Sequence, residues 1–382
     1  MIIFEKSNLG KTSVKIVIHN SGSIFTKPGV VYFLTHIFNT KGSLEKKEKI
    51  YSILEEDAIE FSTSINKEFL TININFLNEK EKKAIKLLKE ILTSPNITNK
   101  SFETSKKEII SKIQNKKNDN DYLASINLYK TIFKNTPLEY PVIGEDIENI
   151  TIDDVKSFYT SIFENSTITM IGGKNINVDE ITSLFKQKNK PYPFFIPKNQ
   201  KDTVLKKEVE QSYIHFASFF DVDYKNEIHL AKIATFILGA GGFGSRIMEE
   251  IRVKRGYAYS AYATNNFKKI YKLLNGYLQT KLKNTNDAIN LIKEIINDFY
   301  EKGVTKKELE LAKKFLIGSE PLRNETINQR LLRKFNEIYL NLPKDYYKKE
   351  LELISNTKLD EVNEFIKNHE EIKNTTFSIV TK

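Results

Sequence analysis

The sequence has 382 residues, 40% of them hydrophobic, which is enough for two domains of ordinary size. It has no cysteine, which excludes disulfides, thiol nucleophiles and thiolate metal sites. The formal net charge is +10, but the lysines are mixed with glutamates and no zinc-finger or RNA-binding motif accompanies them, so no nucleic-acid partner is predicted. No signal-peptide pattern and no apolar run of about 18 residues is present, which predicts a cytoplasmic protein without a membrane partner.

The first half of the chain mixes strand and helix patterns. Alternating hydrophobicity predicts a strand at 13–19 and a strand pair at 60–65 and 69–76. Another strand is predicted at 167–173. Periodic apolar residues predict helices at 30–38, around 50–54, and at 80–93, 101–116, 120–134, 152–163 and 178–187. This order indicates an α+β domain with helices packed on a mostly antiparallel sheet.

Three prolines among polar residues follow, between Lys188 and Lys201, and are typical of an extended connector. We therefore predict an N-terminal domain at 1–187, a linker at 188–203 and a C-terminal domain at 204–382. The segment 84–92 resembles 288–296, and 147–158 resembles 354–365 at nearly the same offset. Two matches in the same order favour two homologous domains over chance similarity of amphipathic helices.

The second half begins with a predicted strand at 212–220 and a helix at 227–238. A glycine-rich segment follows, Gly239-Ala-Gly-Gly-Phe-Gly-Ser-Arg246, and leads into a short helix that Ser245 is expected to cap. In the next strand, Tyr257, Tyr259 and Ala261 are expected on one face and Ala258 and Ser260 on the other. The glycines also match a dinucleotide-binding G-x-G-x-x-G, but a helix precedes them and no acidic residue lies about twenty residues further on, so this interpretation is disfavoured.

This segment resembles the second-domain signature of the pitrilysin/insulinase-type peptidases, which include the mitochondrial processing peptidase. The resemblance rests on the glycine-rich turn, Ser245-Arg246, the E-x-R-x-K-R-G pattern ending at Gly256, and Ala258-Tyr-Ser260. It implies two homologous α+β domains that form half of a clam-shell. It also implies that Arg252 and Tyr259 hold the substrate backbone or the developing oxyanion. Gly241, Gly242 and Gly244 are candidate substrate-binding positions, and the glycines would let the backbone pass close to the interface with a partner chain.

In this family a helix of the first domain carries H-x-x-E-H, whose histidines bind zinc and whose glutamate activates water. At the matching positions this chain has Tyr32 for the first histidine and Thr35 for the glutamate, and only His36 is retained. The third ligand position falls on Lys112 or Ile113, and Glu108 is expected on the wrong turn of its helix unless the register slips. A zinc site needs three protein ligands, so no metal is predicted in this chain and no peptidase chemistry is expected from it alone.

The other histidines, His19, His215, His229 and His369, occur singly and are interpreted as surface or core residues. The strand at 60–65, with Phe61, Ser62 and Thr63, is a candidate edge for an extended peptide, although an ordinary sheet strand is the simpler interpretation.

The resemblance implies a metal-free subunit that complements a homologous zinc-bearing chain, in a heterodimer or a homodimer, and acts on peptides. Zinc is then expected in the partner and not here. Two alternatives remain open, a peptidase-like scaffold or binding protein without a catalytic role, and an autonomous peptidase with an unusual site.

Overall fold

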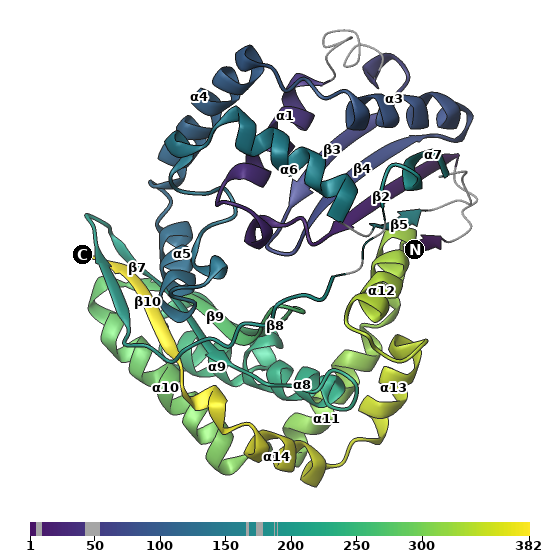
Figure 1. Cartoon of the computed structure of the whole chain (residues 1–382). Coiled ribbons are helices and arrows are strands. Elements are labelled where there is room, and N and C mark those ends of the chain that lie inside the picture. Colours follow the sequence, from purple (N-terminus) through teal and green to yellow (C-terminus); the bar gives the residue numbers. More distant parts are fainter. Residues whose placement is uncertain (5–9, 43–53, 166–167, 173–178, 187, 189) are drawn as a thin grey trace. The chain divides into compact units, whose positions relative to one another are not determined.

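The computed structural model describes residues 1–4, 10–42, 54–165, 168–172, 179–186, 188 and 190–382. They form two compact units, each built on a five-stranded sheet (Figure 1). Unit 1 takes its residues from 1–116, 140–192 and 326–335, and unit 2 takes the rest. Parts of three predicted elements, the helix around 50–54, the strand 167–173 and the helix 178–187, lie outside the described residues.

The sheet of unit 1 has the order β1-β5-β2-β4-β3. In the part of the chain that the structure describes, the β1–β5 pair is parallel and the other strand pairs of this sheet are antiparallel. Its strands are β1 (Ile2–Phe4), β2 (Lys11–His19), β3 (Glu60–Ile65), β4 (Phe69–Leu77) and β5 (Ile168–Gly172).

The sheet of unit 2 repeats this arrangement strand for strand, in the order β6-β10-β7-β9-β8. Again the first strand pairs in parallel with the last, and all other pairs are antiparallel. Its strands are β6 (Thr203–Lys206), β7 (Gln211–Phe219), β8 (Ala258–Phe267), β9 (Lys272–Lys281) and β10 (Thr376–Thr381). The prediction of two homologous α+β domains is therefore confirmed.

Helices cover the sheets. In unit 1 they are α1 (Val30–Lys41), α3 (Glu81–Thr93), α4 (Asn99–Lys116), α6 (Ile152–Asn165) and α7 (Asp179–Thr182). In unit 2 they are α5 (Asn120–Ile132), α8 (Ile228–Thr235), α9 (Arg246–Met248), α10 (Thr285–Lys302), α11 (Lys306–Gly318), α13 (Tyr346–Asn356) and α14 (Leu359–Asn368). The repeated segments 84–92 and 288–296 lie in α3 and α10, which follow β4 and β9. Helix α12 (Ile327–Tyr339) contributes residues to both units.

Helix α5 belongs to unit 2, although the predicted boundary places it in the N-terminal domain. It packs on β10 and β7 and buries Ala124, Leu128 and Ile132. The hydroxyl oxygen of its Tyr129 also lies 3.4 Å from that of Tyr271, the residue before β9. The apolar periodicity of a helix shows that one face is buried but does not show which sheet buries it, so the sequence alone could not make this assignment.

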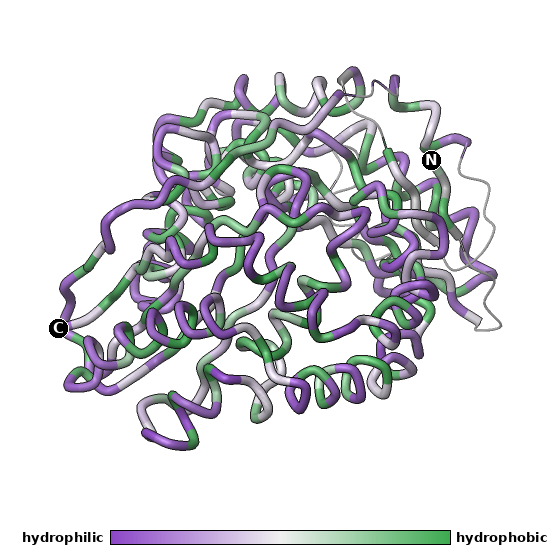
Figure 2. Tube along the Cα trace, turned by 90° about the horizontal axis from the view of Figure 1, so that it is seen from below, coloured by the Kyte–Doolittle hydropathy of each residue, from purple (hydrophilic) through white to green (hydrophobic). Residues whose placement is uncertain are grey.

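Each unit has its own hydrophobic core, with Phe33, Ile16 and Ile72 among the fully buried residues of unit 1 and Phe216 and Phe377 among those of unit 2. Figure 2 shows hydrophobic and hydrophilic residues alternating along the helices, as expected where one face of a helix is buried. Among the described residues, no helix combines the length and the apolar character that a membrane span requires.

Candidate functional site

The glycine-rich segment begins where α8 continues into a π-helical turn, η5 (Phe236–Ala240), and a 3-10 turn follows, η6 (Gly242–Gly244). A Cβ added to Gly239 would lie 2.3 Å from the backbone nitrogen of Ala263, so only glycine lets η5 approach β8 this closely. Gly242 has a φ of 60°, in the left-handed region that favours glycine. The glycines therefore bend the chain sharply beside the edge strand β8.

After this bend, α9 continues into a second π-helical stretch, η7 (Glu249–Lys254). Ile247 and Ile251 are fully buried and anchor it to the core of unit 2. Ser245 stands at the N-cap position as predicted, but its hydroxyl donates to the carbonyl oxygen of Gly242 at 2.8 Å and does not cap the helix.

The predicted faces of strand β8 are wrong at its start. Ala258 pairs with Thr280 and Ala261 with Leu278, so β8 has one extra residue here, a β-bulge. Ala258 and Ala261 are both buried, whereas Tyr259 is 82% exposed. The predicted faces assumed that side chains alternate along a regular strand. The bulge interrupts this alternation and turns Tyr259 toward solvent.

Arg252 and Tyr259 lie side by side. The guanidinium carbon of Arg252 is 4.4 Å from the ring centre of Tyr259 and 4.6 Å from that of Phe243, so the cation lies over both rings. Phe243, which the sequence interpretation did not single out, is 65% exposed. Among the described residues Arg252 has no ion pair, unlike the neighbouring Arg255, which binds Glu250. The arrangement therefore presents a fixed guanidinium with free donors next to a phenol.

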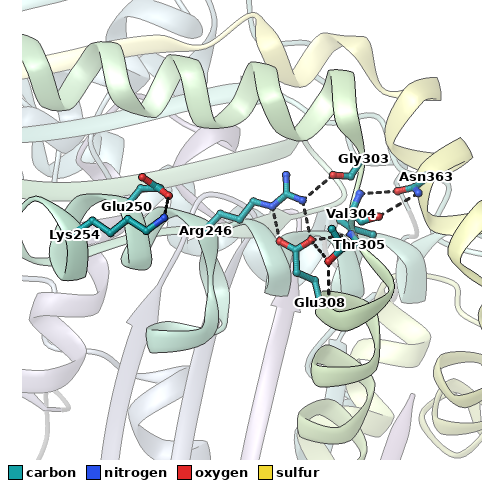
Figure 3. Close-up of polar contacts among 8 residues, drawn as sticks. All are labelled: Arg246, Glu250, Lys254, Gly303, Val304, Thr305, Glu308 and Asn363. Carbon is teal, nitrogen blue, oxygen red and sulfur yellow. Dashed lines mark hydrogen bonds and ion pairs between the residues drawn. The ribbon is translucent and has the colours of Figure 1, made fainter.

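A second arginine of the motif, Arg246, has a structural contact (Figure 3). Its Nε and Nη2 donate to the two carboxylate oxygens of Glu308 at 2.6 and 2.9 Å, and Nη2 also donates to the Gly303 carbonyl at 2.7 Å. Glu308 in turn accepts from the Thr305 backbone and hydroxyl at the N-terminus of α11. Burial raises the pKa of Glu308, but the hydrogen bonds from Arg246 and Thr305 outweigh it and the pKa is lowered overall. Arg246 thus fixes the motif helix to α11.

An open groove of about 770 Å³ runs alongside this helix, and Phe243 and Arg246 are among the residues that line it. Several of its charged side chains neutralise one another, for example Glu250 and Lys254 at 2.6 Å (Figure 3). This groove therefore offers no obvious excess of one charge to a ligand.

The residues that match the zinc motif lie on α1 and α4 in unit 1. His36 Nε2 is 2.6 Å from Glu108 Oε2, and Lys112 Nζ is 3.3 Å from His36 Nδ1. Lys41 donates to both oxygens of Glu108, at 3.0 and 3.1 Å. Both Glu108, expected on the wrong turn for the ligand position unless the register slips, and Lys112 therefore contact His36. Glu108 and Lys112 are four residues apart on α4 and so share one helical face, but this spacing alone does not show that the face packs against His36.

This network leaves no nitrogen of His36 free for a metal. An ammonium group only donates hydrogen bonds, so Nδ1 of His36 accepts from Lys112 and Nε2–H donates to Glu108. Thr35 donates to the Tyr32 carbonyl at 2.9 Å, within its own helix, and Ile113 packs against the core. Within the described ranges, no group of three or more His, Asp or Glu side chains is placed to hold a metal ion. The residues present therefore do not fit the zinc that the family motif implies.

Burial lowers the pKa of His36, and the charges of Lys112 and Lys41 act in the same direction against the hydrogen bond to Glu108. We expect Lys112→Met to raise the pKa of His36, because the variant removes a positive charge and frees Nδ1 to bind a proton. NMR titration of the histidine ring protons measures this shift. Lys106→Met is the matched control, because Lys106 lies on the same helix but binds the carbonyl of Glu148. An unchanged His36 pKa in Lys112→Met, or a shift of the wild-type signal on adding zinc, would contradict the network.

The candidate peptide edge, β3, contacts α1 at its centre. Asn39 Oδ1 accepts from the Thr63 backbone N–H at 2.6 Å, and Asn39 Nδ2 donates to the Thr63 carbonyl at 2.9 Å. Phe61 packs against the core and Ser62 is exposed. Peptide binding at Phe61, Ser62 and Thr63 stays a prediction, and at Thr63 it would require Asn39 to release both backbone groups. No pattern in the sequence indicates that Asn39 contacts Thr63.

The fold and these sites define a chain of the M16 peptidase class. The profile described as Insulinase (Peptidase family M16) matches residues 1–146, and that described as Peptidase M16 inactive domain matches residues 149–316. The chain is 40% identical over 341 residues to the non-peptidase homolog YmxG of Helicobacter pylori, covering 86% of this chain and 79% of that protein. This protein belongs to the insulinase family, peptidase family M16, and the family prediction is confirmed.

The chain is also similar to part of a mitochondrial protein and to a solved structure. Over 144 residues, 36% of this chain and 32% of the other, it is 27% identical to cytochrome b-c1 complex subunit 1 of Saccharomyces cerevisiae mitochondria. The crystal structure of a peptidase M16 inactive domain from Pseudomonas fluorescens superposes with a TM-score of 0.87 and 19% identity, covering 100% of this chain and 95% of that one. Together with the altered zinc motif, the match to the inactive-domain model and the similarity to the non-peptidase homolog indicate a peptidase-like protein that is not catalytically active alone.

Proposed function

We propose that this chain is the zinc-free subunit of a two-component M16 peptidase. It would supply Arg252 and Tyr259 to the active site of a homologous chain that carries an intact H-x-x-E-H, and together the two chains would hydrolyse peptides. The partner would provide zinc and the water-activating glutamate. This chain would provide hydrogen bonds to the substrate backbone and to the oxyanion that forms on it.

The observation that carries this proposal is the state of Arg252. The motif segment 246–255 contains three arginines. Two of them are neutralised by ion pairs, Arg246 with Glu308 and Arg255 with Glu250. Arg252 is instead held by aromatic rings, which fix its position without occupying its N–H donors. Preorganised, unoccupied donors of this kind stabilise a developing negative charge, because no reorganisation is needed when the charge forms.

Mixing the purified chains tests the proposal. We expect each chain alone to show little hydrolysis of a fluorogenic peptide and the mixture to show much more, because neither chain has the complete set of catalytic groups. A partner chain that reaches full activity without this one would contradict the proposed role.

A second candidate function is a peptidase-like scaffold without catalysis, which the similarity to the yeast cytochrome b-c1 subunit favours. The same mixing experiment separates the two. A stable complex that hydrolyses no peptide, and that forms equally well with Arg252→Ala, is the result expected of a scaffold.

A further inference from the structure

One face of the sheet in unit 2 carries a row of rings. His215 of β7 is paired with Tyr277 of β9, and Tyr277 is paired with Tyr262 of β8, so these three side chains point to the same side of the sheet. The ring centres of His215 and Tyr277 are 4.9 Å apart, and those of Tyr277 and Tyr262 are 5.9 Å apart. Tyr262 is 38% exposed, so the row is open to solvent at the β8 end.

The N-terminal turn of α5 brings a carboxylate to this row. Asp121 Oδ1 accepts a hydrogen bond from His215 Nε2 at 2.8 Å, and the Asp121 side chain remains 51% exposed. Burial raises the pKa of Tyr277 to about 12, with Asp121 the next contribution, and burial and Asp121 also raise the pKa of Tyr262. The negative charge of Asp121 therefore acts on both phenols.

This carboxylate is not neutralised by a basic side chain. The chain has 59 Lys and Arg residues against 49 Asp and Glu, yet among the described residues no lysine or arginine pairs with Asp121. The hydrogen bond to His215 uses Oδ1, which leaves Oδ2 available. The combination of aromatic faces with one free carboxylate oxygen attracts a cation, through the ring quadrupoles and through the charge.

The row continues toward the Arg252 site. The bulge at 258–261 turns Tyr259 outward, as Tyr262 is, and the two residues are three positions apart on β8. At about 3.3 Å per residue this corresponds to about 10 Å, which an extended peptide of a few residues spans. A peptide held at Arg252 can therefore place a side chain on the row.

We propose that His215, Tyr277, Tyr262 and Asp121 form a subsite for a lysine or arginine side chain of an extended peptide. The cationic head lies against the rings of Tyr262 and Tyr277 and binds the free oxygen of Asp121. The inference deepens the proposed function, on which it rests, by naming a feature of the substrate. All four residues of the subsite belong to this chain, so peptide binding to it is measured without a partner or zinc.

The test uses the purified full chain and two fluorescein-labelled peptides of alanine, serine and glycine. One carries a single central arginine, and the other carries citrulline, a neutral residue of nearly the same shape. We expect the arginine peptide to bind about tenfold more tightly at low ionic strength, as measured by fluorescence anisotropy. This preference runs against the net positive charge of the chain, so general electrostatic attraction cannot produce it.

Asp121→Asn is expected to abolish the preference while keeping an acceptor for His215, and Tyr262→Leu to reduce it. Asp298→Asn is the matched control, because it removes the same charge from α10, where Asp298 pairs with Lys302, and should leave the preference unchanged. Equal affinity for the two peptides, no measurable binding of either, or a preference that survives Asp121→Asn would overturn the subsite. Failure of the mixed chains to hydrolyse peptides, with the arginine preference intact, would overturn only the proposed function.

Discussion

Arg252→Ala is expected to slow peptide hydrolysis by the assembled pair of chains by about 100- to 1,000-fold. Most of this loss should appear in kcat and less of it in KM. The loss is of this size because removing one preorganised donor to a developing oxyanion removes roughly 3–4 kcal/mol of transition-state stabilisation. Steady-state kinetics on the mixture measures it. The fold should be unaffected, because the rings of Phe243 and Tyr259 that Arg252 contacts are themselves exposed.

Two further variants show which property of the pair matters. Tyr259→Phe keeps a ring against the guanidinium and removes only the hydroxyl, so a loss of rate in this variant assigns a donor role to the phenol. Arg255→Ala removes a nearby positive charge that Glu250 already neutralises, and it should leave the rate nearly unchanged. Equal losses in Arg252→Ala and Arg255→Ala would indicate a general charge effect and would contradict a specific contact at Arg252.

Arg246→Ala is expected to lower the free energy of unfolding by about 2–3 kcal/mol at pH 7. The variant removes two hydrogen bonds to Glu308 and one to Gly303, and leaves a carboxylate that is only about a quarter exposed without its counter-charge. Breaking a fully buried pair costs about 3–5 kcal/mol, and the partial exposure here reduces the figure. Urea unfolding of the two proteins measures the difference.

The same difference should depend on pH. The pKa of Glu308 is lowered in the fold from its ordinary value of 4.5, so its ionised form stabilises the protein above that value and this contribution is lost as the pH falls through the folded-state pKa. Wild type and Arg246→Ala should therefore converge in stability in acid. Lys254→Ala is the control, since it breaks an exposed pair with Glu250 worth at most about 0.5 kcal/mol. A pH-independent difference for Arg246→Ala would show that lost packing, and not the ion pair, accounts for the effect.

The architecture could be predicted because it rests on local patterns. The alternating hydrophobicity of 69–76 predicted β4. The repeated segments 84–92 and 288–296 lie in α3 and α10, which follow equivalent strands of two sheets with the same strand order. The spacing of apolar residues within a short segment indicates a helix or a strand, so these elements can be predicted from a single sequence. The sheet on which α5 packs could not be predicted, because its amphipathic pattern is compatible with either sheet.

The sites could be predicted only in part. The motif brought Arg252 and Tyr259 to attention, but the bulge that exposes Tyr259 depends on the pairing of β8 with β9, which involves residues about twenty positions away. Likewise, Glu108 and Lys112 contact His36 because α4 packs on α1, and Asn39 reaches Thr63 because α1 lies against β3. Such contacts follow from tertiary packing, which a motif of consecutive residues does not encode.

The most direct test of the central claim is to tag this chain in its native cell, purify it and identify the chains that accompany it. We expect a homologous chain of similar length with an intact H-x-x-E-H, present in equal amount and carrying the only zinc of the complex. Recovery of this chain alone, or with zinc bound to it, would contradict the account.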